Sequence, residues 1–213
     1  MNQNLNAPVT RRDIKNALHG MNVDKALGMD GFTTHFIKAC WKLVKCDLHR
    51  MVQHFQRHKL GGSTNSSFLA LIPKYFSASI FNTFRTISLC NIGYKIITKV
   101  IANRLKEILP KIIPANKGSF VKGRRISDNI ILVQEAVHSS LAQKEKGMII
   151  KIDLANAFDR VRHSYLFQVL SCYGFDINFR NWIKACIGEP WIAPLVNGHA
   201  ADFFKASRGL RQG

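Results

Sequence analysis

The spacing of apolar residues divides the chain into helical stretches and short strands. Residues 92–109 carry apolar side chains at i, i+4 and i+5 spacing, which predicts a helix that Pro110 stops. Thr10 and Asp13 form a capping-box-like start for an earlier short helix. Similar spacing predicts further helices over 36–55, 128–141, 164–173 and 179–187. Apolar runs predict strands over 68–74, 84–89, 191–196 and 203–206, the last two joined around Asn197-Gly198. Helices and strands without strict alternation predict an α+β fold.

One further strand is predicted over residues 147–154, and it carries a carboxylate at its end. Ile149, Ile150 and Ile152 are β-branched, which favours extended backbone, and a turn follows them. Asp153 at the tip of a buried strand needs a cation opposite it, and Mg²⁺ is commonly bound in this way. The alternative is a turn aspartate that caps the next helix. Asp159 lies beyond the turn and is the weaker metal candidate.

The glycine- and serine-rich stretch 61–67 interrupts the helical spacing and is the best candidate for a subdomain boundary. No internal repeat and no low-complexity tract is present in the sequence. The turn-rich, doubly basic stretch 207–213 has no element that would close a domain. We therefore expect the chain to be a fragment of a longer protein.

The charge balance points to a polyanionic partner. The 213 residues include 31 Lys and Arg but only 13 Asp and Glu, a formal net charge of +18. Nucleic acid fits this excess, and an anionic membrane surface is the weaker option. No apolar run approaches the roughly 20 residues of a transmembrane helix, so no membrane partner is expected. The start has no signal-peptide pattern, and the five cysteines form no Cys-x-x-Cys pair. We expect reduced thiols without a disulfide partner, in the nucleus or cytoplasm and not in a secreted protein.

Two groups of cations are placed where they could meet phosphates. Lys74 and Arg85 lie near the ends of short extended segments, where a fixed backbone could aim both at one anion. Lys122, Arg124 and Arg125 belong to a basic glycine loop suited to a nucleic-acid backbone. The alternative for both groups is that they are solvated surface cations.

These residues belong to motifs that occur in the same order in LINE-type (non-LTR) retrotransposon reverse transcriptases. The sequence thus resembles that family, and it resembles the plant members in particular. Even the turn Gly28-Met29-Asp30-Gly31-Phe32 is similar to one found upstream of that domain. The similarity covers nearly the whole chain. The motifs are Leu71-Ile72-Pro73-Lys74, Phe84-Arg85-Thr86-Ile87-Ser88-Leu89-Cys90-Asn91, Gly118-Ser119-Phe120-Val121-Lys122-Gly123-Arg124, Lys151-Ile152-Asp153, Ala157-Phe158-Asp159-Arg160-Val161 and Arg208-Gly209-Leu210-Arg211-Gln212-Gly213.

The resemblance implies an incomplete right-hand polymerase fold, the fingers plus the first part of the palm, with helices packed on a small, mostly antiparallel sheet. It places a helical N-terminal extension at residues 1–62 and the reverse transcriptase domain at 63–213. The implied activity is that of an RNA-directed DNA polymerase, a nucleotidyltransferase that uses an RNA template, a DNA primer, dNTPs and Mg²⁺.

The resemblance also implies a role for each site residue. Asp153 would be the first of three carboxylates around two Mg²⁺ ions, with Leu154 also at the metal. Phe158 would be the aromatic gate beneath the incoming sugar. Lys74 and Arg85 would hold the triphosphate, and Gln212 would line the nucleotide pocket. Lys122, Arg124 and Arg125 would contact the template backbone.

The sequence departs from the family pattern in three ways. Thr86 stands where proline is usual, and Lys117 stands where glutamine is common. The paired aspartates of the family lie beyond residue 213, so we expect no polymerase activity from this chain by itself. The alternatives are a non-catalytic basic RNA-binding module and an intron-maturase-like protein.

Overall fold

The computed structural model describes residues 2–57, 60–62, 64–144, 146–188 and 190–212. The chain divides into two compact units: a main unit of Met1–Ala102 with Asn156–Gly213, and a second unit of Asn103–Ala155. Helices and a mixed sheet confirm the α+β class. The division between residues 62 and 63 stays a prediction, and Ser63 and Gly213 themselves lie outside the described residues.

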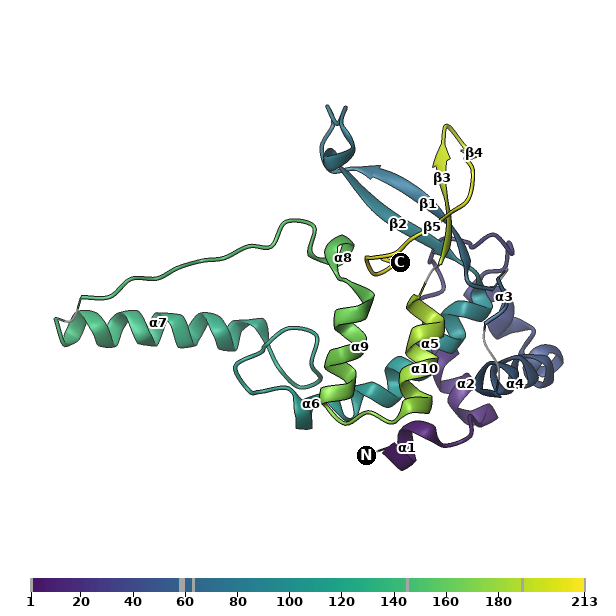
Figure 1. Ribbon diagram of the computed structural model, residues 1–213, viewed down its shortest axis with the longest axis horizontal. Coiled ribbons are helices and arrows are strands. Elements are labelled where there is room, and N and C mark those ends of the chain that lie inside the picture. Colours follow the sequence, from purple (N-terminus) through teal and green to yellow (C-terminus); the bar gives the residue numbers. More distant parts are fainter. Residues whose placement is uncertain (1, 58–59, 63, 145, 189, 213) are drawn as a thin grey trace. The chain divides into compact units, whose positions relative to one another are not determined.

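Within the described residues, the main unit holds a five-stranded sheet of order β2-β1-β3-β4, with β5 also paired to β3 (Figure 1). β1 runs antiparallel to β2 and parallel to β3, whereas β4 and β5 are antiparallel to β3. The four strands predicted in these regions are confirmed, although the last is shorter than expected. The strands are β1 (Ser66–Pro73), β2 (Phe84–Cys90), β3 (Trp191–Val196), β4 (His199–Ala200) and β5 (Phe204–Lys205).

The Asn197-Gly198 turn forms the predicted tight hairpin. Val196 pairs with His199 directly across the two-residue loop. Asn197 and Gly198 have φ values of 51° and 82°, the left-handed backbone that a two-residue hairpin loop of this kind requires. The sequence signal therefore predicted the place of this turn, although the strand that follows it directly is β4 and not the predicted strand 203–206.

Most helices lie in the main unit. The short helices α1 and α8 were not predicted, and two predicted helices differ from the observed ones. The helix predicted over 36–55 is divided at Cys40, and the helix predicted to reach residue 109 ends at Lys106. Pro110 instead lies in the first turn of α6, where a missing N–H costs nothing. The helices of the main unit are α1 (Asn2–Asn6), α2 (Arg11–His19), α3 (Thr34–Ala39), α4 (Trp41–Arg57), α5 (Ile92–Lys106), α8 (Ala157–Arg160), α9 (His163–Cys172), α10 (Ile177–Ile187) and the 3-10 turn η1 (Phe81–Thr83).

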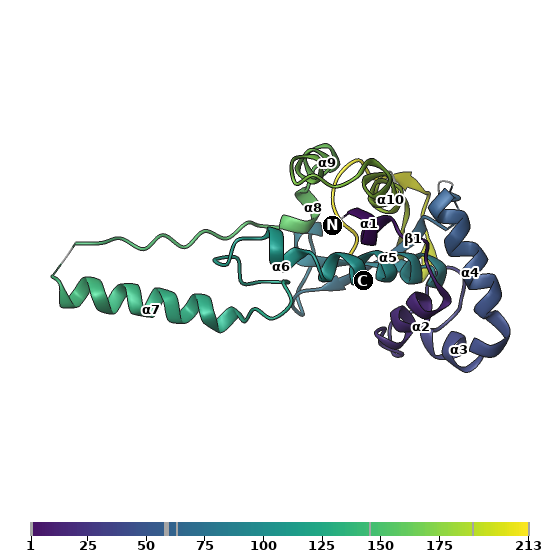
Figure 2. The ribbon, with the colours of Figure 1, turned by 90° about the horizontal axis from the view of Figure 1, so that it is seen from below.

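The hydrophobic core of the main unit lies around α5 and α10. Ile96 and Ile97 of α5 are buried, as is Phe179 of α10, which contacts the rings of Phe175 and Trp182. The first helix is tied to this core: α1 lies beside α10 (Figure 2), and its Asn6 Nδ2 donates a 2.7 Å hydrogen bond to the Asp176 carboxylate. The N-terminal helices are therefore part of the same packed unit as the sheet.

The turn Gly28–Phe32 is docked against the start of α5. The Asp30 carboxylate accepts a 2.7 Å hydrogen bond from the Ile92 N–H, the first residue of that helix, and the Asp30 N–H donates to the Asn91 side chain at 3.1 Å. An aspartate in this place satisfies an N–H that the helix cannot pair internally and interacts favourably with the helix dipole. These hydrogen bonds link parts of the chain that are 61 and 62 positions apart in sequence, and they orient α5, the central helix of the core.

We expect Asp30→Ala to lower the free energy of unfolding by about 1–2 kcal/mol, because the Ile92 N–H loses its acceptor and the helix loses an N-terminal charge. Asp24→Ala is the matched control, since Asp24 is an exposed aspartate of the preceding turn. Urea denaturation followed by tryptophan fluorescence measures the difference. Equal denaturation midpoints for the two variants would contradict the capping role.

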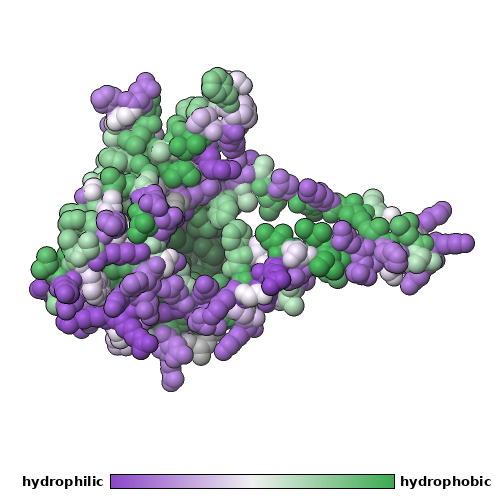
Figure 3. Space-filling model, turned by 180° about the vertical axis from the view of Figure 1, so that it is seen from behind, coloured by the Kyte–Doolittle hydropathy of each residue, from purple (hydrophilic) through white to green (hydrophobic). Residues whose placement is uncertain are grey.

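The second unit contains α6 (Leu109–Ile112), α7 (Ile126–Ala142) and an extended segment, residues 146–155. α7 confirms the helix predicted over 128–141, yet none of its residues is buried. Hydrophobic side chains instead line the surface of α7 and of the extended segment (Figure 3). This unit therefore presents more apolar surface to solvent than an independent domain normally does.

The prediction of a buried strand over residues 147–154 is wrong. The segment is extended but is not a strand, and the side chains of Ile150 and Ile152 are 69% and 79% exposed. β-branched residues favour extended backbone, but a strand forms only where a neighbour pairs with its N–H and C=O groups. No described strand pairs with these residues. The missing partner strand explains why the prediction fails.

Candidate functional site

The β1–β2 hairpin positions two of the predicted cations. Ile72 pairs with Arg85, and the Lys74 N–H continues the ladder by donating to the Thr83 carbonyl at 2.9 Å. Because successive strand residues point to opposite faces, Lys74 lies on the same face of the hairpin as Arg85. Both residues are exposed, so this face presents two positive charges to solvent.

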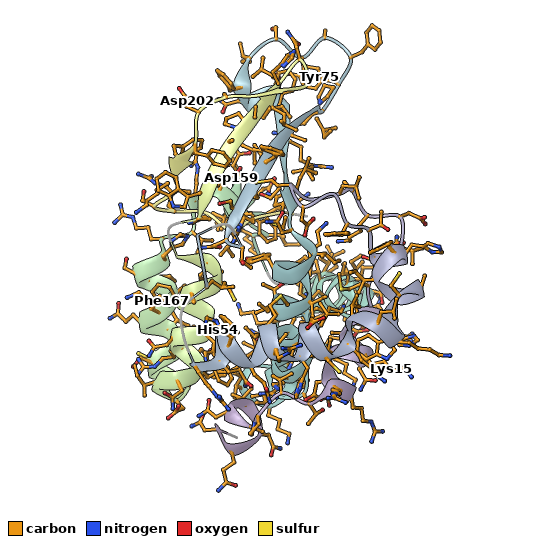
Figure 4. All side chains as sticks on the ribbon, turned by 90° about the vertical axis from the view of Figure 1, so that its right-hand side faces the viewer. Lys15, His54, Tyr75, Asp159, Phe167 and Asp202 are labelled. Carbon is orange, nitrogen blue, oxygen red and sulfur yellow. The ribbon has the colours of Figure 1, made fainter. Side chains whose placement is uncertain are left out.

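Lys74 also closes the tip of this hairpin. Its Nζ donates a 2.8 Å hydrogen bond to the Asn82 carbonyl, across the loop that contains Tyr75. Tyr75 lies at the end of the hairpin farthest from the helices of the main unit (Figure 4). The lysine therefore has a structural contact in addition to its predicted role. Thr86, which stands where the family usually has proline, pairs with Leu71 in mid-strand.

The segment around Phe158 is joined to the segment that leads to Gln212. The Leu210 N–H donates to the Phe158 carbonyl at 2.9 Å, and the Gly209 N–H donates to the Val161 carbonyl at 2.8 Å. Gly209 has a φ of 89°, and a Cβ added to it would lie 3.1 Å from the Asp159 carbonyl oxygen. Phe158 itself is half-exposed at the start of α8. A glycine in this motif is needed because the two backbones approach so closely.

The same segment then reaches β2, the strand of Arg85. The Ser88 N–H donates to the Gln212 carbonyl with 2.6 Å between nitrogen and oxygen. Ser88 also pairs with Leu69 of β1, so the Gln212 backbone lies along the outer edge of the sheet. Residues from three distant motifs (Arg85, Phe158 and Gln212) are thereby connected through backbone hydrogen bonds within the main unit.

Arg211 anchors this arrangement and was not singled out in the sequence. Its guanidinium lies 4.0 Å from the centre of the Tyr94 ring and donates to the Asn65 carbonyl at 3.0 Å and to the Cys186 carbonyl at 2.6 Å. Nη2 also donates to the Asn65 side-chain oxygen. The Tyr94 hydroxyl donates to the same Cys186 carbonyl at 3.0 Å. One arginine thus connects the turn before β1, α5 and α10 to the segment that carries Gln212.

The groups around Arg211 are buried enough to raise their pKa values. Burial raises the pKa of the Cys186 thiol to about 12, and Arg211 acts weakly in the opposite direction. Burial likewise raises the pKa of the Tyr94 hydroxyl well above its ordinary value. Both groups are therefore neutral near pH 7, and the positive charge of Arg211 interacts with dipoles and a ring. All five cysteines are free thiols.

Asp153 and Leu154 lie in the second unit, on the exposed extended segment. A Mg²⁺ ion requires several oxygen ligands in near-octahedral geometry. Among the residues that the structure describes, no three His, Cys, Asp or Glu side chains come together. The described residues therefore supply one candidate carboxylate and not a complete metal site.

The basic glycine loop is ordered mainly by Arg124. Its guanidinium donates to four carbonyls of the preceding turn, those of Pro110, Ile113, Pro114 and Lys117, at 2.5–3.4 Å. Lys122 forms a 2.9 Å ion pair with the exposed Glu107, which lowers the pKa of that carboxyl. Arg125 is exposed at the start of α7. Of the three predicted phosphate-binding cations, Arg124 thus has its donors directed into the loop.

The predicted residues therefore fall in two different units of the chain. Lys74, Arg85, Phe158 and Gln212 belong to the main unit, and the residues of the second unit are Lys122, Arg124, Arg125, Asp153 and Leu154. No sequence signal marks Arg211 as an anchor, because its partners Asn65 and Tyr94 are remote in sequence. No described helix is long and apolar enough to cross a membrane.

Comparison with known proteins identifies the family. The sequence profile of the reverse transcriptase (RNA-dependent DNA polymerase) family matches residues 72–213. The transposon TX1 uncharacterized 149 kDa protein of Xenopus laevis is 30% identical over 99% of this chain and 16% of its own length. A retrovirus-related Pol polyprotein from type-1 retrotransposable element R2 of Popillia japonica is 26% identical over 97% of this chain and 28% of its own length.

The R2 polyprotein of Nasonia vitripennis is similar as well, 24% identical over 99% of this chain and 20% of its own length. The chain thus spans less than a third of the length of these relatives. The plant-like character of the sequence stays a prediction. Since the family profile covers most of the chain and the relatives belong to non-LTR elements, the chain belongs to the LINE-type branch of the reverse transcriptase family.

Proposed function

We propose that this chain forms the fingers and the first part of the palm of a right-hand polymerase that synthesises DNA on an RNA template from a DNA primer. The observation that carries the proposal is the hydrogen-bonded connection of Phe158, Gln212 and the strand of Arg85 in the main unit. We also propose that the protein acts in the nucleus or the cytoplasm, because RNA and dNTPs occur together there.

The side chains of the hairpin fit a triphosphate. Arg85 offers a planar guanidinium, which can bind two phosphate oxygens at once, and Lys74 offers a compact ammonium on the same face. Their charges would stabilise the negative charge that increases on the phosphates as the nucleotide is transferred. The backbone at Gln212, fixed to Ser88, would hold that side chain near the base of the incoming nucleotide.

The described residues give the least support to the metal-dependent part of the proposed reaction. Mg²⁺ would be bound in part by Asp153, with Leu154 beside it, but one exposed carboxylate does not complete a two-metal site. We therefore propose that the chain does not extend a primer by itself. The exposed segment 146–155 would gain a paired strand, and α7 a covering partner, in a longer protein of this family.

Binding of a dNTP to the chain, in the presence of a primer–template and measured by titration calorimetry, tests the triphosphate site. We expect Arg85→Ala to weaken binding about tenfold, because hydrogen bonds to charged groups contribute roughly 1.5–3 kcal/mol. Arg12→Ala is the matched control, since Arg12 is an exposed arginine of α2. Lys74→Ala should act like Arg85→Ala, with Lys15→Ala of the distant helix α2 as its control (Figure 4).

The same titration separates this proposal from a basic RNA-binding module. Salt-dependent RNA binding without any response to dNTP, unchanged in Arg85→Ala, would favour the module. Primer extension by the purified chain, abolished by Asp153→Ala, would overturn the statement that the chain is inactive alone. A nucleic-acid affinity independent of salt would count against both functions, given the net charge of +18.

A further inference from the structure

Phe120 is the most unusual residue of the second unit. Its side chain is 93% exposed, although phenylalanine is usually buried, and the neighbouring Val121 is only 9% exposed. The backbone at Phe120 has a φ of 62°, a left-handed conformation that is rare for a bulky residue. The valine is held inward and the larger aromatic ring is turned outward, against the preference of both the backbone and the side chain.

The loop holds this conformation through contacts on both sides of Phe120. Arg124 donates to the carbonyls of Ile113 and Lys117 at 2.6 and 2.8 Å, so the turn before Phe120 is tied to the residues after it. Gly118 packs against the Asn129 side chain so closely that an added Cβ would lie 2.7 Å from its Nδ2 atom. Strained residues that a surrounding structure holds in place are frequent where a protein binds a ligand.

The chemistry around the ring favours a polyanion with flat bases. Lys117 and Arg125 are exposed, and Lys122 is half-exposed beside its ion pair with Glu107. An exposed ring in a loop that also carries exposed cations is a combination with which proteins bind single-stranded nucleic acid, the ring stacking on a base and the cations contacting phosphates. A duplex offers no free base face to such a ring, because its bases are stacked on one another.

We propose that Phe120 is a stacking platform for an unpaired base of the nucleic-acid strand that this chain binds. The site consists of the Phe120 ring, with Lys117 and Arg125 as phosphate contacts, and Arg124 is a positioning residue that orders the loop. This inference rests on the proposed function only in taking nucleic acid as the ligand. It adds that Phe120 contacts a base and that this base must be unpaired.

Fluorescence anisotropy with a labelled single-stranded RNA tests the proposal on the whole chain. We expect Phe120→Ala to weaken binding about tenfold, since stacking on an aromatic side chain contributes on that order per base. Phe120→Leu should lose as much, whereas Phe120→Trp should bind at least as tightly as the original chain. Leu141→Ala, which removes an exposed apolar side chain from the end of α7, is the control and should change nothing.

Three further measurements separate stacking from charge and from loop order. The slope of log affinity against log salt should be the same for Phe120→Ala and the original chain, because no phosphate contact is removed, whereas Arg125→Ala should reduce it by about 0.7. An abasic oligonucleotide should bind the original chain and Phe120→Ala equally. Phe120→Gly relieves the backbone strain but removes the ring, so it should bind as weakly as Phe120→Ala.

The outcomes distinguish this inference from the proposed function. If the original chain binds the RNA but Phe120→Ala binds equally well, the stacking platform is overturned and the proposed function is untouched. Restored binding in Phe120→Gly would show that loop strain, and not the ring, determines affinity, and would also overturn it. If the original chain binds no RNA at any salt concentration, both proposals fail.

Discussion

Replacement of Gly28 by alanine is expected to lower the free energy of unfolding by about 3 kcal/mol, the upper part of the usual range for an overpacked site. A Cβ at this position would lie 2.4 Å from the Cys90 carbonyl oxygen and 2.6 Å from the Asn91 Cα. Both atoms are backbone, at the junction of β2 and α5, so neither can move aside as a flexible side chain would. The turn must shift away, and Asp30 then loses its hydrogen bond to the Ile92 N–H.

Two other glycines serve as controls for this prediction. Gly61 has nothing within 4 Å of the added Cβ, so Gly61→Ala should leave stability unchanged. Gly31 also has free space but a φ of 69°, so Gly31→Ala should cost only the left-handed backbone, about 1–2 kcal/mol. Urea denaturation followed by tryptophan fluorescence reports on the main unit, because Trp182 packs against Phe55 and Phe179. A Gly28→Ala midpoint equal to that of Gly61→Ala would refute the close packing.

Elements whose stability depends on nearby residues were predictable from the sequence. The capping box at Thr10 and Asp13 forms as expected, with the Asp13 N–H donating to the Thr10 hydroxyl at 3.2 Å. The Asn197-Gly198 hairpin forms because both residues accept left-handed backbone. The period of apolar positions likewise predicted α7 and α10, although the ends of the helices differ by one to several residues.

Features that depend on distant residues were not predictable. The segment 147–154 has the composition of a buried strand, yet composition cannot supply the neighbour that a strand must pair with. The N-terminal turn at Gly28 was noticed only as a family resemblance, and its contact with Cys90 and Asn91 follows from the fold. Phe120 gave no signal in the sequence beyond its motif, because the left-handed backbone that exposes it arises from the loop contacts of Arg124.

The site residues divide along the same line. The sequence predicted Lys74 and Arg85 near the ends of two short strands. Their common face follows from the register of β1 and β2, which the structure supplies. The joining of Phe158 to Leu210, and of Gln212 to Ser88, involves segments separated by roughly 50 and 120 residues, and such pairing is determined by the tertiary fold. The template contact expected of Arg124 stays a prediction. Its hydrogen bonds to four carbonyls could not be predicted from the sequence, because they depend on how the loop folds.

Arg211→Leu is expected to lower the free energy of unfolding by about 2–3 kcal/mol, since hydrogen bonds from a charged group contribute roughly 1.5–3 kcal/mol and a cation–π contact adds about 1 kcal/mol. Leucine retains part of the apolar volume against the Tyr94 ring but leaves the Asn65 and Cys186 carbonyls without this donor. Arg211→Lys should recover only a small part of the loss, because an ammonium lacks the planar fork with which a guanidinium reaches acceptors on Asn65 and on α10 together. Arg208→Leu is the matched control: Arg208 is an exposed arginine of the same segment, so its replacement should leave the urea midpoint within the scatter of ordinary surface variants.

Arg211→Leu should also release the Gln212 backbone from β2, which faster hydrogen exchange of the Ser88 amide would report. A Ser88 amide that stays protected in Arg211→Leu would mean that the edge pairing holds the segment without the arginine.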